Sequence, residues 1–276
     1  MEEDLVIIVP IYNTELAPYE IETLSYNKKN FKKYRVVIIS PNHLKNHYRL
    51  KDYKNTLNAE VEFFENNYFK STRSYNKLMM SIEFYKRFYI FDYMLICQLD
   101  AVLLKPNLEH WCAKQIDYMG APWMSKMNDE YEIDSSGNGG FSLRNIKKHL
   151  EVLNSKSMYM DDYKLNHTPL RIGLKNLVIL KILNKLSSGL KVNFPFINCY
   201  KLIFSGNEDY FWAFSAKFFV NEFNLGNRSE SLAFAFEKNV ERCLELNEGK
   251  CPTGIHAWQK YNPILSKQLM EKAITE

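Results

Sequence analysis

The chain has 276 residues, 46% of them hydrophobic, and a formal net charge of +4. This length can bury a substantial core, and the charge lacks the basic bias expected of nucleic-acid-binding domains. The five Cys residues form no CxxC pair, which argues against a disulfide framework or zinc site and favours the cytoplasm. The short N-terminal apolar run favours a strand over a signal peptide, and no run reaches the roughly 18 residues of a spanning helix.

Apolar runs alternate with helical patterns from the N-terminus onward. Four short runs, the first of them rich in β-branched residues, predict strands: 5–12, 34–40, 61–64 and 93–99. Residues 15–30 and 74–88 can form helices, the second because its apolar residues recur at helical spacing. The alternation predicts one α/β domain over 1–276 with a Rossmann-like, mostly parallel sheet. Ligands of such sheets bind beyond the carboxyl ends of the strands.

A single acid, Asp100, follows the apolar strand YMLICQL. A carboxylate at this edge is well placed to hold Mg or Mn against a diphosphate. An ordinary turn or helix-cap acid is the alternative, because Asp100–Ala101 lacks the second acid of a DxD motif.

The stretch SSGNGGFSLRN, residues 135–145, places Gly139 and Gly140 directly after Asn138. Adjacent glycines let the backbone approach a ligand closely, although a plain turn is the alternative. The combination of an amide, two glycines and an apolar strand favours the ligand-binding interpretation.

Two later stretches carry side chains suited to catalysis or metal binding. In GNEDYFWAF, Asn207 can cap a helix whose first turn holds Glu208 and Asp209, or one of these carboxylates is a general base. In CPTGIHAWQKY, His256 is either a structural hydrogen-bonding residue or a ligand of Mn. The nearby Trp258 could stack on a sugar face.

Taken together, seven stretches occur in an order that resembles a known family: VPIY, SYNKLMMS, QLDA, YMGAPW, GNGGFSLR, NED and GIHAW. The chain is similar, over about residues 5–261, to a bacterial family of GT-A-type glycosyltransferase domains found in polysaccharide gene clusters. That family has long been catalogued as a domain of unknown function. The resemblance implies a GT-A fold, with a mixed, mostly parallel sheet flanked by helices, and a nucleotide-sugar donor, with UDP favoured.

The resemblance also implies site roles. Asp209 would be the catalytic base, with Glu208 second, and Asp100 and His256 would bind Mn or Mg. Donor contacts are expected at ten residues: Pro10, Ile11, Tyr12, Asn76, Lys77, Gln98, Asp100, Asn138, Gly139 and Gly140. Acceptor contacts are expected at Trp123 and Trp258.

The expected function is an inverting, metal-assisted glycosyltransferase acting on a glycan or lipid-linked glycan hydroxyl. Gln98 stands where the first acid of the DxD motif would be. A catalytically silent glycan- or nucleotide-binding domain is therefore the alternative.

A basic amphipathic insert is predicted over residues 155–207. No Asp or Glu occurs from Tyr163 to Asn207, and 172–190 mixes Lys with Leu and Ile at near-helical spacing. Such a helix can lie on an anionic membrane surface, and a solvated surface helix is the alternative. The membrane interpretation predicts a cytoplasmic protein that binds peripherally to the inner membrane face, where lipid-linked acceptors are made.

Overall fold

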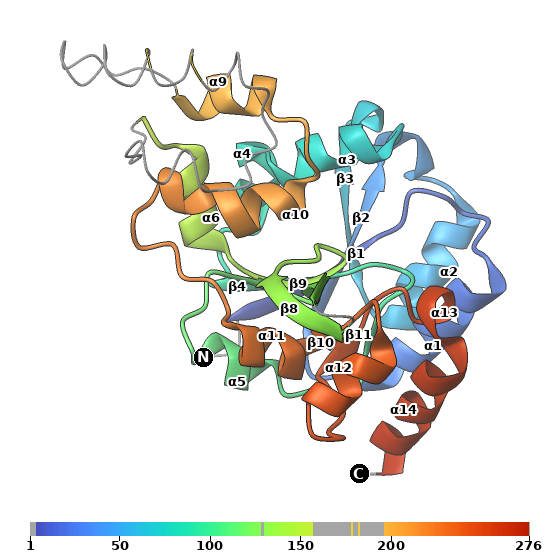
Figure 1. Ribbon diagram of the computed structural model, residues 1–276. Coiled ribbons are helices and arrows are strands. Elements are labelled where there is room, and N and C mark those ends of the chain that lie inside the picture. Colours follow the sequence, from blue (N-terminus) through green and yellow to red (C-terminus); the bar gives the residue numbers. More distant parts are fainter. Residues whose placement is uncertain (1–3, 128–129, 157–177, 179–181, 183–195, 276) are drawn as a thin grey trace.

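A six-stranded sheet forms the centre of the computed structural model, which describes residues 4–127, 130–156, 178, 182 and 196–275 (Figure 1). In spatial order the strands are β3 (Glu60–Phe64), β2 (Arg35–Pro41), β1 (Leu5–Pro10), β4 (Tyr93–Cys97), β9 (Phe141–Asn145) and β6 (Tyr118–Gly120). The first four are parallel, and β9 runs antiparallel to both its neighbours. The four predicted strands and the mixed, mostly parallel sheet expected of the GT-A fold class are confirmed.

Helices cover both faces of this sheet (Figure 1). One face carries α3 (Thr72–Met79), α4 (Ile82–Arg87) and α6 (Ile146–Leu153), and the other carries α1 (Pro18–Asn30), α2 (Tyr48–Leu57), α5 (Leu108–Cys112) and α11 (Arg228–Phe234). Successive strand side chains point to opposite faces, so Val6 and Ile8 join the first core cluster while Ile7 and Val9 join the second. Burial on both faces explains why β1 is a continuous apolar run.

The helix predicted over 74–88 is two helices, α3 and α4. The break occurs because Ser81 accepts a hydrogen bond at 3.1 Å from the backbone N–H of Phe84 and so caps a new helix. Serine satisfies an N-terminal N–H that would otherwise have no partner. The apolar spacing continues through this cap, which is why periodicity alone predicted a single helix.

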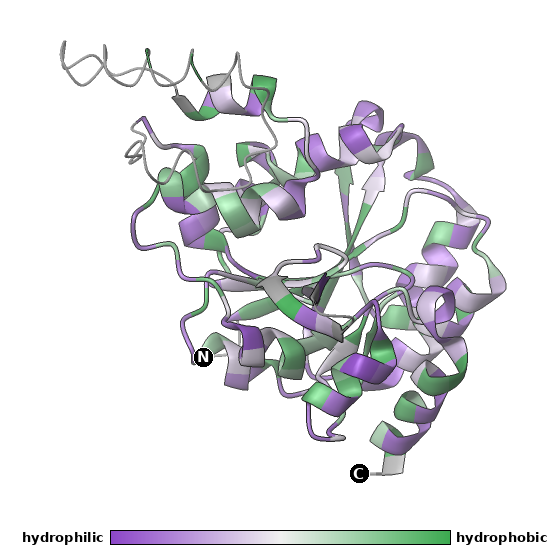
Figure 2. Ribbon diagram, viewed as in Figure 1, coloured by the Kyte–Doolittle hydropathy of each residue, from purple (hydrophilic) through white to green (hydrophobic). Residues whose placement is uncertain are grey.

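Two smaller sheets and the C-terminal helices complete the described fold. One sheet has the order β10 (Ala235–Phe236), β11 (Gly254–Ile255), β5 (Val102–Leu103), and the other pairs β7 (Pro122–Met127) with β8 (Glu130–Ser136). The other α-helices of the described residues are α9 (Phe196–Ile203), α10 (Glu208–Tyr210), α12 (Val240–Leu246), α13 (Trp258–Tyr261) and α14 (Pro263–Thr275). Figure 2 shows hydrophobic and hydrophilic residues mixed along α14, as expected of a helix that packs through one side.

Most of the predicted basic insert, including nearly all of 172–190, lies outside the described residues. Its amphipathic helix and its contact with a membrane therefore stay predictions. Within the described ranges, no helix is long and apolar enough to cross a membrane.

Candidate functional site

Two loops meet at one edge of the central sheet. One follows β4, and the other is the stretch 138–140 before β9, here called the glycine segment. Because β9 is antiparallel to β4, its first residue, Phe141, lies opposite Cys97, the last residue of β4. The N–H of Gln98 donates to the carbonyl of Gly140 at 2.9 Å, which extends this pairing by one residue. Asp100 and the glycine segment therefore share the edge beyond the carboxyl ends of the parallel strands, where the sequence predicted a site.

The small sheet brings His256 beside Asp100. In the antiparallel pair of β11 and β5, Ile255 lies opposite Val102. His256, which follows Ile255, therefore comes close to Asp100, which lies just before β5. On the other side, β10 runs parallel to β11 and places Glu237, the next residue after that strand, beside the same imidazole. His256 Nε2 lies 3.3 Å from Asp100 Oδ1, and its Nδ1 lies 3.4 Å from Glu237 Oε1.

These three side chains set one another's charge. Burial disfavours the charged form of His256, but the carboxylates of Asp100 and Glu237 outweigh it and raise the pKa of His256 to about 9. Burial likewise works to raise the pKa of Asp100, and the hydrogen bond and charge of His256 overcome it and lower that pKa. The group combines two carboxylates with one cationic imidazole.

Asp100 and His256 would hold a divalent cation only with His256 in its neutral form, because a cationic imidazole has no free lone pair at Nε2. Their 3.3 Å separation is close to the roughly 3 Å between adjacent ligands of an octahedral ion with bonds of about 2.1 Å. A carboxylate oxygen suits Mg or Mn, and an imidazole nitrogen favours Mn. Glu237 on the far ring nitrogen matches the carboxylate that commonly orients a metal-binding histidine. In the part of the chain that the structure describes, no cluster of three or more His, Cys, Asp or Glu could hold a metal.

The glycine segment is packed tightly against both parts of the site. A Cβ on Gly139 would lie 2.4 Å from Glu208 Oε1, and a Cβ on Gly140 would lie 2.1 Å from His256 Nε2. Both positions therefore require glycine. The side-chain oxygen of Asn138 accepts a 2.8 Å hydrogen bond from the N–H of Gly140 and fixes the turn. Glu208 and Asp209 contact Gly139 while His256 contacts Gly140, and the Cα atoms of these two neighbouring glycines are about 3.8 Å apart.

Glu208 and Asp209 begin α10, but their surroundings differ. Glu208, only 5% exposed, forms a two-point ion pair with Arg144 through contacts of 2.9 and 3.0 Å. Asp209 accepts backbone N–H bonds from Gly139 at 3.4 Å and Tyr210 at 2.7 Å. Burial first, and then the charge of Glu208, raise the pKa of Asp209 to about 7. Asp209 therefore has the proton affinity of a base that works near neutral pH.

Arg144 and Glu237 were not predicted as site residues. Arg144 has no exposed surface, and besides its ion pair it donates to the hydroxyls of Ser142 at 3.0 Å and Tyr85 at 3.1 Å. Its signal in the sequence was a single cation inside the apolar strand FSLR, two positions after Ser142 and thus on the same face. Glu237 had no comparable local signal, because only the pairing of β10 with β11 brings it to His256.

The first loop contributes an exposed aromatic ring. Tyr12 is 55% exposed, stacks on Phe69 at 6.3 Å, and has a pKa that is raised by burial, Glu20 and then Asp100. Pro10 and Ile11 are buried, and both backbone polar groups of Ile11 are hydrogen-bonded within the sheet. Ile11 therefore has no free polar group in this structure and Pro10 belongs to the core of the strand, and the donor contacts predicted for both residues stay predictions.

The remaining predicted donor residues lie around α3 and the end of β4. The side chain of Asn76 donates to Asn207 at 3.0 Å, and Asn207 makes no side-chain cap on α10, so the predicted cap is wrong. Lys77 is exposed, and Gln98 is half-buried beside the hydroxyl of Tyr75. Asn76 therefore links α3 directly to the helix that carries the acidic pair.

The two predicted acceptor residues have different environments. Trp258 is only 2% exposed, and its Nε1 donates to Thr23 Oγ1 at 2.8 Å. The prediction that it stacks on a sugar is corrected, because no face of the buried ring is open. Trp123 is half-buried and stacks against Tyr210 at 5.3 Å and Phe214 at 5.7 Å, next to α10. Its acceptor role stays a prediction.

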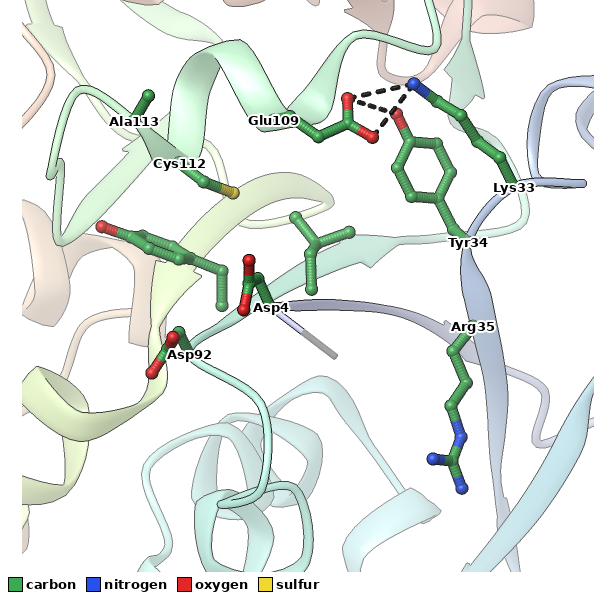
Figure 3. Close-up of a pocket in the computed structure, with 10 residues that line it drawn as sticks. Asp4, Lys33, Tyr34, Arg35, Asp92, Glu109, Cys112 and Ala113 are labelled. Atoms are coloured by element: carbon green, nitrogen blue, oxygen red, sulfur yellow. Dashed lines mark hydrogen bonds and ion pairs between the residues drawn. The ribbon is translucent and has the colours of Figure 1, made fainter. Parts of the chain in front are cut away.

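A pocket of about 680 Å³ lies at the opposite edge of the sheet (Figure 3). It is lined by Asp4, Arg35 and Asp92, which lie at the amino ends of parallel strands, and by Glu109, which is held by Lys33 at 3.0 Å. None of the predicted site residues is among the ten that line it. This pocket is therefore separate from the candidate site.

Three solved structures are weakly similar to this chain in structure. S. aureus TarS in complex with UDP is 15% identical, with 52% of this chain and 47% of that chain covered and a TM-score of 0.32. A cytidylyltransferase from Leptospira borgpetersenii is 10% identical, covering 55% of this chain and 63% of that chain at 0.34. A glycosyltransferase involved in glycosylation of the major capsid of PBCV-1 is 9% identical, covering 99% of both at 0.38.

These likenesses are too weak to establish an activity. The chain spans about half the length of the TarS segment 1–349 and under two thirds of that cytidylyltransferase. No curated protein matches it significantly. Residues 58–256, well over half of the chain, match the family described as "Protein of unknown function (DUF5672)". The match runs from the start of β3 to His256 and includes Asp100, the glycine segment and Asp209, so the chain belongs to the DUF5672 family.

Proposed function

We propose that this protein is an inverting glycosyltransferase that moves a sugar from a nucleotide-sugar donor, with UDP favoured, to a hydroxyl of a glycan or lipid-linked glycan. The observation that carries the proposal is that two adjacent glycines contact the two groups: Gly139 donates to Asp209, and Gly140 packs against His256. Inversion needs a base on the attacking hydroxyl and groups that stabilise the leaving diphosphate. Asp209 and His256 supply these two kinds of group next to one segment.

The leaving-group side consists of Asp100, His256 and Glu237. Asp100 and His256 would hold a divalent cation, with Mn favoured over Mg by the nitrogen ligand. Such a cation supplies Lewis-acid stabilisation of the charge on the departing diphosphate. Glu237 turns Nδ1 of His256 toward itself and leaves Nε2 facing Asp100. Tyr12 offers an exposed ring on which the nucleobase can stack.

On the acceptor side, Asp209 takes the proton from the attacking hydroxyl. With a pKa of about 7, roughly half of this carboxyl is ionised at neutral pH, which matches the requirement for a general base. The N–H groups of Gly139 and Tyr210 orient it. Glu208 does not fill this role, because Arg144 occupies both of its oxygens.

A donor screen with product analysis tests the proposal. UDP, GDP and CMP sugars are incubated with the protein and Mn²⁺, and the anomer of the product is determined by NMR. We expect transfer or hydrolysis of at least one donor, with inversion. Asp209→Asn should retain donor binding in a thermal-shift assay and lose transfer by at least about 100-fold.

The matched control is Asp92→Asn, which removes an acid at the opposite edge of the sheet and should keep full activity. Stabilisation by a nucleotide without turnover of any donor would favour a binding domain and contradict the proposal. Retention of the anomeric configuration would contradict the assignment of Asp209 as base.

The lipid-linked class of acceptor is tested through the basic insert predicted from the sequence. We expect the protein to bind vesicles that contain anionic lipid and not neutral vesicles. Replacing Lys181 and Lys185 by Glu should weaken this binding. Unchanged binding of that double variant would contradict the membrane interpretation while leaving the proposed chemistry intact.

A further inference from the structure

The ion pair between Arg144 and Glu208 is buried in the middle of the fold. Arg144 is 0% exposed and Glu208 is 5% exposed. All three guanidinium nitrogens have partners, which are the two oxygens of Glu208 and the hydroxyls of Ser142 and Tyr85. Replacing a buried ion pair by well-packed apolar residues often leaves the stability of a protein unchanged or raises it. Stability alone therefore does not account for this pair.

The pair packs directly against Gly139, and Arg144 Nη2 donates to the carbonyl of Gly139 at 3.5 Å. A Cβ there would lie 2.4 Å from Glu208 Oε1 and 3.4 Å from Arg144 Nη2. The hydroxyl of Ser142, which receives a bond from Arg144, donates to the carbonyl of Gly139 at 2.9 Å. The N–H of the same glycine donates to Asp209. A displacement of the pair would therefore move the glycine segment and Asp209 together.

The pair also determines which charges act on Asp209. Glu208 on its own helix and Arg144 on β9 are the charged side chains that act most strongly on Asp209, and Tyr118 on β6 also interacts with it. Glu208 favours the protonated form of Asp209, while Arg144 favours the ionised form. The two members of the pair thus act on Asp209 with opposite signs.

We propose that Arg144 and Glu208 form the positioning unit of the glycosyl transfer, fixing the glycine segment against α10 and balancing the charge around Asp209. This inference rests on the proposed function. Neither residue touches the reacting atoms, because each is bonded to the other and buried behind Gly139.

The test is the pH profile of kcat/KM for three variants. Glu208→Gln removes the negative charge and leaves Arg144, so the acid limb should move to lower pH by at least about half a unit. Arg144→Met leaves Glu208 uncompensated, so the limb should move to higher pH. Arg144→Lys keeps the charge but loses the two-point geometry. The Arg144→Lys variant should keep the acid limb of the kcat/KM profile at the wild-type pH, while kcat falls at least roughly tenfold and the donor KM changes less than about twofold.

The opposite directions of the first two shifts are the diagnostic result, because loss of packing alone would not produce them. Shifts in the same direction, or wild-type kcat in Arg144→Lys, would overturn the inference. Glu208→Gln without transfer at any pH would identify Glu208 as the base and would also overturn it. If Arg144→Met fails to fold, the other two variants still decide.

Arg87→Met is the control, since it removes an ion pair with Glu83 in which the two side chains are 35% and 44% exposed. It should change neither the pH profile nor kcat. Wild-type protein that transfers no sugar from any donor would refute both the proposed function and this inference. Active wild-type protein with an unaffected Arg144→Lys variant would refute this inference alone.

Discussion

Replacing Asp209 by Asn should stabilise the protein at pH 8 while it abolishes sugar transfer. Burial and the neighbouring charge of Glu208 raise the pKa of Asp209 from 3.8 to about 7. The ionised carboxylate is therefore less stable in the folded chain than in the unfolded chain. Asn carries no charge, so its burial at the same position avoids this cost.

The sign and size of the effect follow from proton linkage. Because the folded-state pKa of Asp209 is raised, its stabilising contribution is full below about pH 4 and is lost as the pH rises through about 7. The shift of about three units corresponds to about 4 kcal/mol at pH 8. Asn has one acceptor oxygen for the N–H groups of Gly139 and Tyr210, so about 1 kcal/mol is lost with one hydrogen bond. The net gain at pH 8 is about 3 kcal/mol.

The assay is urea denaturation of wild type and Asp209→Asn at pH 4, 6 and 8, followed by tryptophan fluorescence. The difference in the free energy of unfolding should be below about 1 kcal/mol at pH 4, where the wild-type carboxyl is itself neutral, and should grow toward pH 8. Wild-type transfer should fall about tenfold per pH unit below pH 7.

Asp92→Asn serves as control and should lack the pH-dependent gain in stability, because Asp92 is partly exposed and paired with Lys147. An equal stability change for Asp209→Asn at pH 4 and pH 8 would refute the reasoning from burial. Full transfer by Asp209→Asn would refute its role as base.

Three further substitutions test the surroundings of the site. Gly140→Ala should displace His256 and prevent Mn²⁺ binding in isothermal titration calorimetry, because its Cβ would lie 2.1 Å from Nε2. Gly249→Ala is the control: its φ of 71° makes Ala strained there and lowers stability, but no atom lies within 4 Å of its Cβ, so Mn²⁺ binding should stay normal. Tyr12→Ala should weaken UDP binding about tenfold without lowering the melting temperature, since the ring is 55% exposed. Trp258→Phe should cost about 1 kcal/mol of stability, because it removes the bond that Trp258 donates to the Thr23 hydroxyl, which keeps its own bond to the carbonyl of Tyr19, and a raised acceptor KM would contradict its burial.

Local pattern was sufficient to predict the central strands. The apolar runs that became β1, β2 and β4 carry their signal in consecutive residues, because a strand buried on both faces is apolar throughout. The edge strand β3 is only partly buried and left the shorter run VEFF. The placement of Asp100 at the ligand-binding edge followed from the same pattern, since that edge lies where the carboxyl ends of parallel strands meet. The helix over 74–88 was predicted less well, because one capping serine, Ser81, divided a continuous apolar spacing.

The chemical character of the site was decided by tertiary structure. Glu208 and Asp209 are adjacent acids with the same local sequence, yet the first is neutralised by Arg144 from β9 and the second has a pKa of about 7. Likewise, the register of β5 with β11 brings Asp100 to His256 across a long separation in sequence.

Burial of a residue also depends on the packing of distant elements. Trp258 is buried in a core cluster, where its ring nitrogen donates to Thr23 on α1. No pattern in the residues around Trp258 could reveal this contact. The sequence by itself determined which elements form and which residue types are available, because periodicity is a property of neighbouring residues. Proton affinity, the contact of Asp100 with His256, and exposure were set by the fold, because electrostatic and packing interactions act through space between segments that the chain keeps far apart.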